Sequence, residues 1–307
     1  MAQDFQVGRL LAGCEPTFPS TQNMLHCLKT VFYYPLERFV ATKFKMPSVE
    51  RSCVVHEVAA DGIVENVAFD HSSWDAVLKA HVRRGTLDGI VLNVVDYHAL
   101  ANDDRVAAYR NSLSAADLGT LSPNEKLALY INAYNCLCAG LIVARLASTG
   151  ALPVSINDLS SDGTPVWKQP AGVVGGERLS LDDIEHRILR SRWREPRVHS
   201  SIVCASVSCP DLRPEAFVAS RINEQMDDQC ATWLRNEHKG VGRSGRTLTL
   251  SRILLWFQQD FVAVAPSVGA WAARYLDTDH PARPLAQRNA SPAFFEYNWK
   301  LNAAADA

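Results

Sequence analysis

The sequence predicts a mixed α+β fold that is mainly helical and contains a small central β-sheet. Several segments carry apolar residues at helical spacing, and the strongest of them begins at a capping serine, Ser122. Short β-branched runs, such as the one from Gly89 to Tyr97, lie between these segments and predict strands. The chain of 307 residues is 47% hydrophobic and 21% charged, which is typical of a globular domain with a large core.

Composition and charge limit the function classes. The formal net charge of -2 lacks the basic excess of nucleic-acid-binding proteins, so no nucleic-acid partner is expected. No run of 18 apolar residues is present, and the N-terminus lacks the apolar core of a signal peptide, so no membrane span is predicted. Eight cysteines are too sparse for a disulfide scaffold and indicate reduced thiols. We therefore expect a cytoplasmic protein.

Residues 1–68 are predicted to form a helical N-terminal extension. Apolar residues between Gln22 and Lys45 have helical spacing, and Pro35 breaks or kinks this helix. The basic end of the segment leaves contact with an acidic membrane surface open, although packing on the protein body is favoured. The main domain is expected at residues 69–302, followed by a disordered tail at residues 303–307.

The main domain is expected to begin with a helix from Trp74 to Val82, the β-branched run, and a weak helix from Ala99 to Leu113. Residues 150–176 are predicted to be mostly loop. The later predicted elements are a helix over Glu215–Leu234, a strand over Thr247–Leu250, a helix capped by Ser251, a helix over Val268–Leu276 and a closing strand over Phe294–Asn302.

The most strongly specified element is the helix predicted over residues 122–146. Ser122 serves as the N-cap, with proline at the first helical position and glutamate at the third, which form a capping box. Asn132, Asn135 and Cys136 share one side of this helix. Asparagines in an apolar helix need hydrogen-bond partners. They either hold neighbouring backbone or line a site and orient an imidazole.

A second capped helix is predicted to start at Ser180, with Asp183 at its third position. His186 lies roughly 200° round this helix from the apolar Ile184, which favours a surface position. The next segment, residues 197–210, reads R-V-H-S-S-I-V-C-A-S-V-S-C-P and is predicted to be a buried strand that ends in a loop.

This segment brings one imidazole, His199, within eleven residues of two thiols, Cys204 and Cys209. Loops at the ends of rigid strands often carry catalytic side chains. The alternative is that Cys204 is a small core hydrophobe, which is the commonest position of a free cysteine.

Five segments together resemble one family. They read L-S-P-N-E-K-L-A-L-Y-I-N-A-Y-N (121–135), L-S-L-D-D-I-E-H-R-I-L-R (179–190), H-S-S-I-V-C-A-S-V-S-C-P-D-L (199–212), L-S-R-I-L-L-W-F-Q-Q-D-F (250–261) and Y-N-W-K-L-N (297–302). In this order they are similar to the Domain of Unknown Function 547 family, over about residues 69–302. The family usually carries Asp between the Tyr and Trp of the last segment, where this chain has Asn298.

The resemblance implies a set of signature positions, which raises the expectation of a site at each. These positions are Asn132, Asn135, Asp183, His186, His199, Cys204, Cys209 and Asn302. Fusions of the family to leucine-zipper, glutaredoxin or DEP domains imply signalling or redox settings. The resemblance implies no cofactor and no settled reaction.

Thiol chemistry is the first reading of these residues. The candidate catalytic residues are Cys204, Cys209, His199, His186, Asn132, Asn135 and Asp183. A cysteine nucleophile needs an imidazole base, which in turn needs an orienting group, here an asparagine or Asp183. On a straight strand His199 and Cys204 face opposite sides, which favours pairing Cys209 with His199, or Cys204 with His186.

The reaction would be hydrolysis of an amide or thioester, or acyl transfer, on an unidentified small-molecule or peptide substrate. A helix with polar residues against a small sheet is reminiscent, by analogy only, of papain-like and transglutaminase-like hydrolases.

Other readings of the same residues remain open. The main alternative is a non-catalytic interaction or scaffold domain with a protein partner, in which the thiols are buried and the histidines satisfied. Two further alternatives are a zinc site formed by His186, His199, Cys204 and Cys209 and a redox disulfide between the two cysteines. The thiol reading predicts that Cys204 or Cys209 lies within hydrogen-bonding reach of His186 or His199, or about one side-chain rotation from it.

Overall fold

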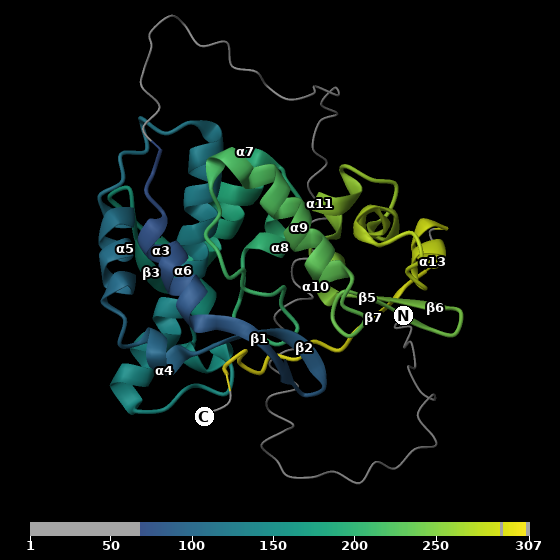
Figure 1. Ribbon diagram of the computed structural model, residues 1–307, viewed down its shortest axis with the longest axis horizontal. Coiled ribbons are helices and arrows are strands. Elements are labelled where there is room, and N and C mark those ends of the chain that lie inside the picture. Colours follow the sequence, from purple (N-terminus) through teal and green to yellow (C-terminus); the bar gives the residue numbers. More distant parts are fainter. Residues whose placement is uncertain (1–67, 289–290, 305–307) are drawn as a thin grey trace, which may run out of the picture. The chain divides into compact units, whose positions relative to one another are not determined.

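The computed structural model describes residues 68–288 and 291–304, and the helical extension predicted for residues 1–68 lies outside them apart from its last residue. The described part is a mixed α+β fold that is mainly helical, as predicted (Figure 1). Its helices are α3 (Ser72–His81), α4 (Tyr97–Leu100), α5 (Asp104–Ser114), α6 (Pro123–Thr149), α7 (Ser191–Trp193), α8 (Val198–Ser201), α9 (Ile222–Leu234), α10 (Arg252–Trp256), α11 (Gln258–Val262), α12 (Val268–Ala272) and α13 (Arg283–Gln287).

Helix α6 is the centre of the fold and begins where the capping box predicts. The Ser122 hydroxyl accepts the Glu125 amide at 3.2 Å, and the helix ends at Gly150 in the left-handed conformation. It is long and apolar enough to cross a membrane, but 83% of its apolar stretch is buried inside the protein. A core helix has the same composition, so this is weak support for a membrane span.

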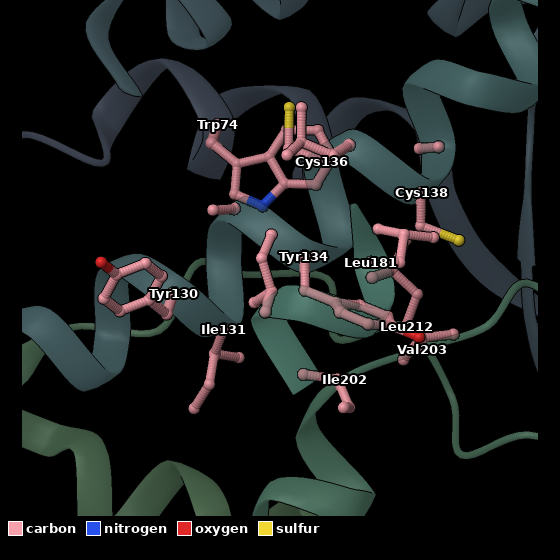
Figure 2. Packing of buried hydrophobic residues seen from close by; sticks show 14 of the residues in the cluster. Trp74, Tyr130, Ile131, Tyr134, Cys136, Cys138, Leu181, Ile202, Val203 and Leu212 are labelled. Carbon is pink, nitrogen blue, oxygen red and sulfur yellow. The ribbon is translucent and has the colours of Figure 1, made fainter. Parts of the chain in front are cut away.

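The main apolar cluster forms around α6. Figure 2 shows Tyr130, Ile131 and Tyr134 of this helix within one group of buried side chains. Ile202 and Val203, from the segment that carries the candidate thiols, are part of the same cluster. The candidate loop is therefore anchored directly on the central helix.

Three small antiparallel or mixed sheets take the place of the single central sheet that was predicted. Strands β1 (Val82–Leu87) and β2 (Ile90–Val95) form a hairpin, and the turn residues Asp88 and Gly89 both have positive φ. The other strands are β3 (Pro170–Val174), β4 (Glu177–Ser180), β5 (Val241–Ser244), β6 (Thr247–Leu250) and β7 (Ala293–Phe294). The strands are too short and too widely separated by helices to join one sheet.

The strand predicted at the start of residues 197–210 is wrong. The structure has a single helical turn there, α8. The hydroxyls of Ser200 and Ser201 donate to the Arg197 carbonyl at 2.8 and 3.0 Å, which stabilises the turn. Serine side chains that bond nearby backbone compete with strand formation, and here they outweigh the β-branched residues.

Several other element boundaries differ from the prediction. The weak helix of residues 99–113 is divided into α4 and α5, because Asp103 caps α5 with its side chain. The helix predicted from Glu215 begins as η4 (Ala219–Arg221) and continues as α9. The loop of residues 150–176 contains η1 (Ile156–Leu159), η2 (Val166–Lys168) and β3, and the predicted last helix is α12 with η5 (Ala273–Tyr275). Helix α13 was not predicted.

The C-terminal segment runs beside the β1–β2 hairpin towards the chain end (Figure 1). Leu301 forms a bridge with Ser206, and Ala303 forms one with Val95. The Ala304 amide donates to the Val95 carbonyl at 2.8 Å, so backbone pairing extends two residues into the predicted tail. Residues 305–307 lie outside the described part of the chain.

A candidate thiol site

Residues 202–210, here called the cysteine loop, are held from two sides. The Asn135 amide of α6 donates to the Ser201 carbonyl at 2.9 Å and accepts the Val203 amide at 2.8 Å. From the other side, the Asn302 backbone amide donates to the Ala205 carbonyl at 3.0 Å. Ala205 has φ 59°, an uncommon conformation for a residue with a side chain. These contacts fix the backbone on both sides of Cys204.

The Cys204 sulfur lies in a group of hydrogen-bond donors. It is 3.0 Å from the Ser206 hydroxyl and 3.2 Å from the Tyr297 hydroxyl, and the two hydroxyls are 3.1 Å apart. The Ser206 backbone N–H also donates to the sulfur. Hydroxyl protons rotate to suit their acceptor. The arrangement therefore suits an anionic sulfur, and Cys204 remains partly exposed.

The second thiol, Cys209, is buried beside the first. Its sulfur accepts the Cys204 backbone amide at 3.0 Å. Burial raises the pKa of both thiols, but for Cys204 the hydrogen bonds from Cys209, Ser206 and Tyr297 outweigh burial and lower its pKa. The pKa of Cys209 stays well above its ordinary value. Of the pair, Cys204 is the thiol that ionises first.

A histidine–carboxylate pair lies in the same part of the domain. The buried His199 ring stacks on Phe257 with centroids 4.1 Å apart, and its Nε2 is 2.7 Å from Asp260 Oδ2. Arg190 Nε donates to the same oxygen at 2.7 Å. Burial lowers the pKa of His199, while the Asp260 carboxylate acts in the opposite direction. Burial opposes ionisation of Asp260, but the bonds from His199 and Arg190 hold its pKa below the ordinary value.

Glu185 lies next to His199. Its Oε1 is 3.9 Å from His199 Nδ1, and its Oε2 accepts the Tyr134 hydroxyl at 3.5 Å. Burial raises the pKa of Glu185 to about 8, against the opposing effect of Arg190, and the charge of Cys204 adds to the rise. Glu185 is therefore a mostly neutral acid at pH 7 within electrostatic range of the sulfur.

The predicted orienting residues have other partners. Asn132 donates to the Phe217 carbonyl at 2.8 Å and accepts its amide at 3.0 Å, so both asparagines of α6 hold backbone. Asp183 caps its helix by accepting the Ser180 amide and hydroxyl at 3.0 and 2.7 Å. The group that bonds His199 is Asp260, not one of these three.

The predicted thiol–imidazole pairs are not joined by the hydrogen bonds described above. The Cys204 sulfur is bonded to the hydroxyls of Ser206 and Tyr297, and the Cys209 sulfur accepts the Cys204 backbone amide. His199 is bonded to Asp260. His199 and Cys204 were predicted to face opposite sides of a strand. This prediction is wrong because His199 lies in a helical turn. His186, which is partly exposed, is 2.7 Å from Arg190 Nη1 through its Nδ1. Its place in a reaction stays a prediction.

The zinc alternative gains no support, since no three His, Cys, Asp or Glu side chains within residues 68–288 and 291–304 converge to hold a metal ion. The five cysteines in this part of the chain are all free, including Cys204 and Cys209. Asn298, where the family usually has Asp, donates its side-chain amide to Asp88 at 3.0 Å. Its side chain is directed to the exposed ion pair between Asp88 and Lys300 rather than to the thiols.

Sequence reasoning missed several residues that complete the site. They are Glu185, Arg190, Ser206, Asp260 and Tyr297. All five lie inside the segments on which the family resemblance depends, and this was the signal that was available. Their spacing along the chain gives no sign that they meet.

Comparison with known proteins supports the resemblance. Residues 118–234 match the model of a family described as "Protein of unknown function, DUF547". The matched region contains α6, η3 (Asp183–Arg190, wound as a π-helix) and the cysteine loop, while Asp260 and Tyr297 lie downstream of it. No curated protein and no solved structure matches the chain, so the analogy with papain-like hydrolases gains no support. Residues 118–234 of the chain are thus similar to the DUF547 family.

Proposed function

We propose that this domain is a thiol enzyme that hydrolyses an amide or thioester, or transfers its acyl group, with Cys204 as the nucleophile. The observation that carries the proposal is the surroundings of the Cys204 sulfur, which hydroxyls of Ser206 and Tyr297 approach at 3.0 and 3.2 Å. Reactive cysteines are partly exposed and have a lowered pKa, whereas structural cysteines are buried and inert. Cys204 has both properties of the reactive class.

The reaction would proceed through an acyl-enzyme. The Cys204 thiolate attacks the carbonyl carbon, a C–S bond forms, and the C–N or C–S bond to the leaving group breaks. The leaving group takes a proton from Glu185, a neutral acid within electrostatic range of Cys204. Water, or an acceptor nucleophile, then attacks the acyl carbon, returns its proton to Glu185 and releases the thiolate.

The His199–Asp260 pair would support the acid. Asp260 fixes the Nε2 of His199, which leaves Nδ1 directed towards Glu185 at 3.9 Å. A carboxylate that orients a histidine is a recurring part of such sites. In this proposal His199 is a positioning residue that adjusts the proton affinity of Glu185. Reduced thiols require a reducing compartment, so the cytoplasmic location belongs to the same proposal.

A non-catalytic interaction domain is the second candidate. It is favoured by the fact that Asn132, Asn135 and Asn302 all use their hydrogen bonds to hold the protein's own segments together. In that case the signature residues would serve folding alone. Cys204 would then react slowly with electrophiles and form no acyl-enzyme.

Trapping the acyl-enzyme distinguishes the two candidates. The full chain is incubated with p-nitrophenyl acetate, and acetylated peptides are identified by mass spectrometry. The proposal expects acetylation of Cys204, its loss in Cys204→Ser, and its retention in the matched control Cys138→Ser, which removes a buried core thiol. Acetylation spread over surface lysines with none at Cys204 would contradict the proposal.

A further inference from the structure

Four aromatic side chains, here called the aromatic wall, are in contact beside the cysteine loop. They are Trp167, Trp256, Tyr297 and Trp299. The Tyr297 ring is 4.8 Å from Trp256 and 4.5 Å from Trp299, measured between centroids. Trp256 stacks on Trp299 at 5.8 Å, and Trp167 lies 6.4 Å from Trp299.

The aromatic wall is hydrogen-bonded to the candidate nucleophile through Tyr297. Tyr297 contributes its ring to the wall and its hydroxyl to the Cys204 sulfur, at 3.2 Å. The other rings come from η2, from α10 and from the C-terminal segment, which are far apart in sequence. The four rings therefore meet only because the fold brings these elements to the thiol.

The wall also lies where two apolar clusters of the domain approach each other. Trp167 packs against the cluster around α6, whereas Trp256 and Tyr297 pack against the second cluster, formed by residues between 230 and 286. All four rings are partly exposed, in contrast to Trp74, Trp233 and Trp271, which are fully buried. Ligand sites are lined predominantly by apolar and aromatic side chains.

Neighbouring rings of the aromatic wall meet at different angles. Trp256 and Tyr297 are tilted by 46°, and Tyr297 and Trp299 by 52°. Another aromatic ring packs on exposed rings of this kind through edge-to-face and offset contacts. A cation is also attracted to exposed ring faces, so an ammonium-bearing reagent is included in the test as the comparison.

We propose that the aromatic wall binds the acyl side of the substrate and selects acyl groups that carry an aromatic ring near the reacting carbonyl. This assignment rests on the proposed function of Cys204. It adds Trp256 and Trp299 as specificity-determining residues and names the substrate class, an aryl-substituted amide or thioester.

The test compares three alkylating reagents that share one reactive group. Rates of Cys204 labelling are measured with iodoacetamide, with N-benzyl-iodoacetamide, and with an iodoacetamide that carries a quaternary ammonium group. Each rate is divided by that of glutathione with the same reagent. One aromatic contact corresponds to a preference of about 2- to 10-fold, so the benzyl reagent is expected to exceed iodoacetamide by this factor.

Substitutions then identify the side chains that cause the benzyl preference. Trp299→Ala is expected to remove most of the benzyl preference, so that the glutathione-corrected rates with the benzyl reagent and with iodoacetamide become nearly equal. Trp193→Ala is the matched control, because Trp193 is also partly exposed but has Tyr130 as its ring partner, and it should keep the preference. A measurement without any substitution complements them: unreactive phenylacetamide should slow iodoacetamide labelling of Cys204, whereas acetamide should not.

The outcomes separate the two proposals. Fast Cys204 labelling with no benzyl preference and no protection by phenylacetamide would overturn the proposed role of the aromatic wall. The proposed role of Cys204 as the nucleophile would stand. A preference for the ammonium reagent would overturn the aromatic substrate class. Slow labelling of Cys204 by all three reagents would overturn the proposed function and this assignment with it.

Discussion

Replacing Lys239 by methionine removes one half of a buried ion pair behind the cysteine loop. Lys239 is 2% exposed, and its ammonium group donates to Asp211 Oδ1 at 2.5 Å and to the Cys209 carbonyl at 2.7 Å. Asp211 is also buried and keeps one other cationic partner, Arg84, at 2.6 Å. Methionine retains the apolar stem but leaves both acceptors without this donor.

The magnitude follows from these contacts. Removing one partner of a buried pair costs about 3–5 kcal/mol, because a charge stays buried without compensation. Since Arg84 remains, the lower end applies, and we expect Lys239→Met to reduce the free energy of unfolding by about 3 kcal/mol. The measurement is urea denaturation followed by tryptophan fluorescence and circular dichroism.

Two comparisons make this prediction specific. Lys79→Met breaks an exposed pair with Asp75 and should change the free energy of unfolding far less than Lys239→Met does. Adding Asp211→Leu to Lys239→Met should recover much of the stability, because no buried charge is then left unpaired. Equal effects of the Lys79 and Lys239 substitutions would refute the reasoning.

Three further predictions concern the core and the site. Burial lowers the pKa of His71 from 6.5 to about 4, so folding keeps it neutral; stability should be full above pH 6.5 and fall by about 3 kcal/mol as the pH drops to 4. Comparing acid unfolding of the wild type and His71→Gln checks this, and an identical pH dependence would contradict it. Asn135→Ala leaves two buried backbone groups unpaired and should cost about 2–4 kcal/mol in urea denaturation, unlike a surface substitution. Tyr297→Phe removes one hydroxyl from the Cys204 sulfur and should move the midpoint of Cys204 alkylation to higher pH, and a midpoint that stays in place would count against the hydrogen bond.

Local signals along the chain were enough to predict the helical elements with strong caps. The capping serine at Ser122 and the Ser180–Asp183 box both form as predicted, because all the groups involved lie within one helical turn. The helical turn α8 could not be predicted from β-branched residues alone. Its stability depends on serine bonds to Arg197, on the hydrogen bond from Asn135 of α6 to Ser201, and on contacts with α9.

The candidate site was predicted only in part, because it also depends on contacts between segments that are far apart in sequence. Cys204, Cys209 and His199 lie close together in sequence and were identified. Their actual partners come from other segments: Tyr297 is 93 residues from Cys204, and Asp260 is 61 residues from His199. Which polar residue meets which across such distances is decided by tertiary packing, which spacing along the chain does not encode.

The reactivity of Cys204 is the central claim, and residue-resolved iodoacetamide labelling between pH 5 and 9 tests it most directly. We expect Cys204 to label faster than every other cysteine at neutral pH, with a midpoint well below the value of about 8.5 for a free cysteine. The buried Cys136 and Cys138, whose pKa values burial raises, should stay unlabelled in the folded protein. A Cys204 that labels as slowly as these two, or with the midpoint of a free cysteine, would contradict the account.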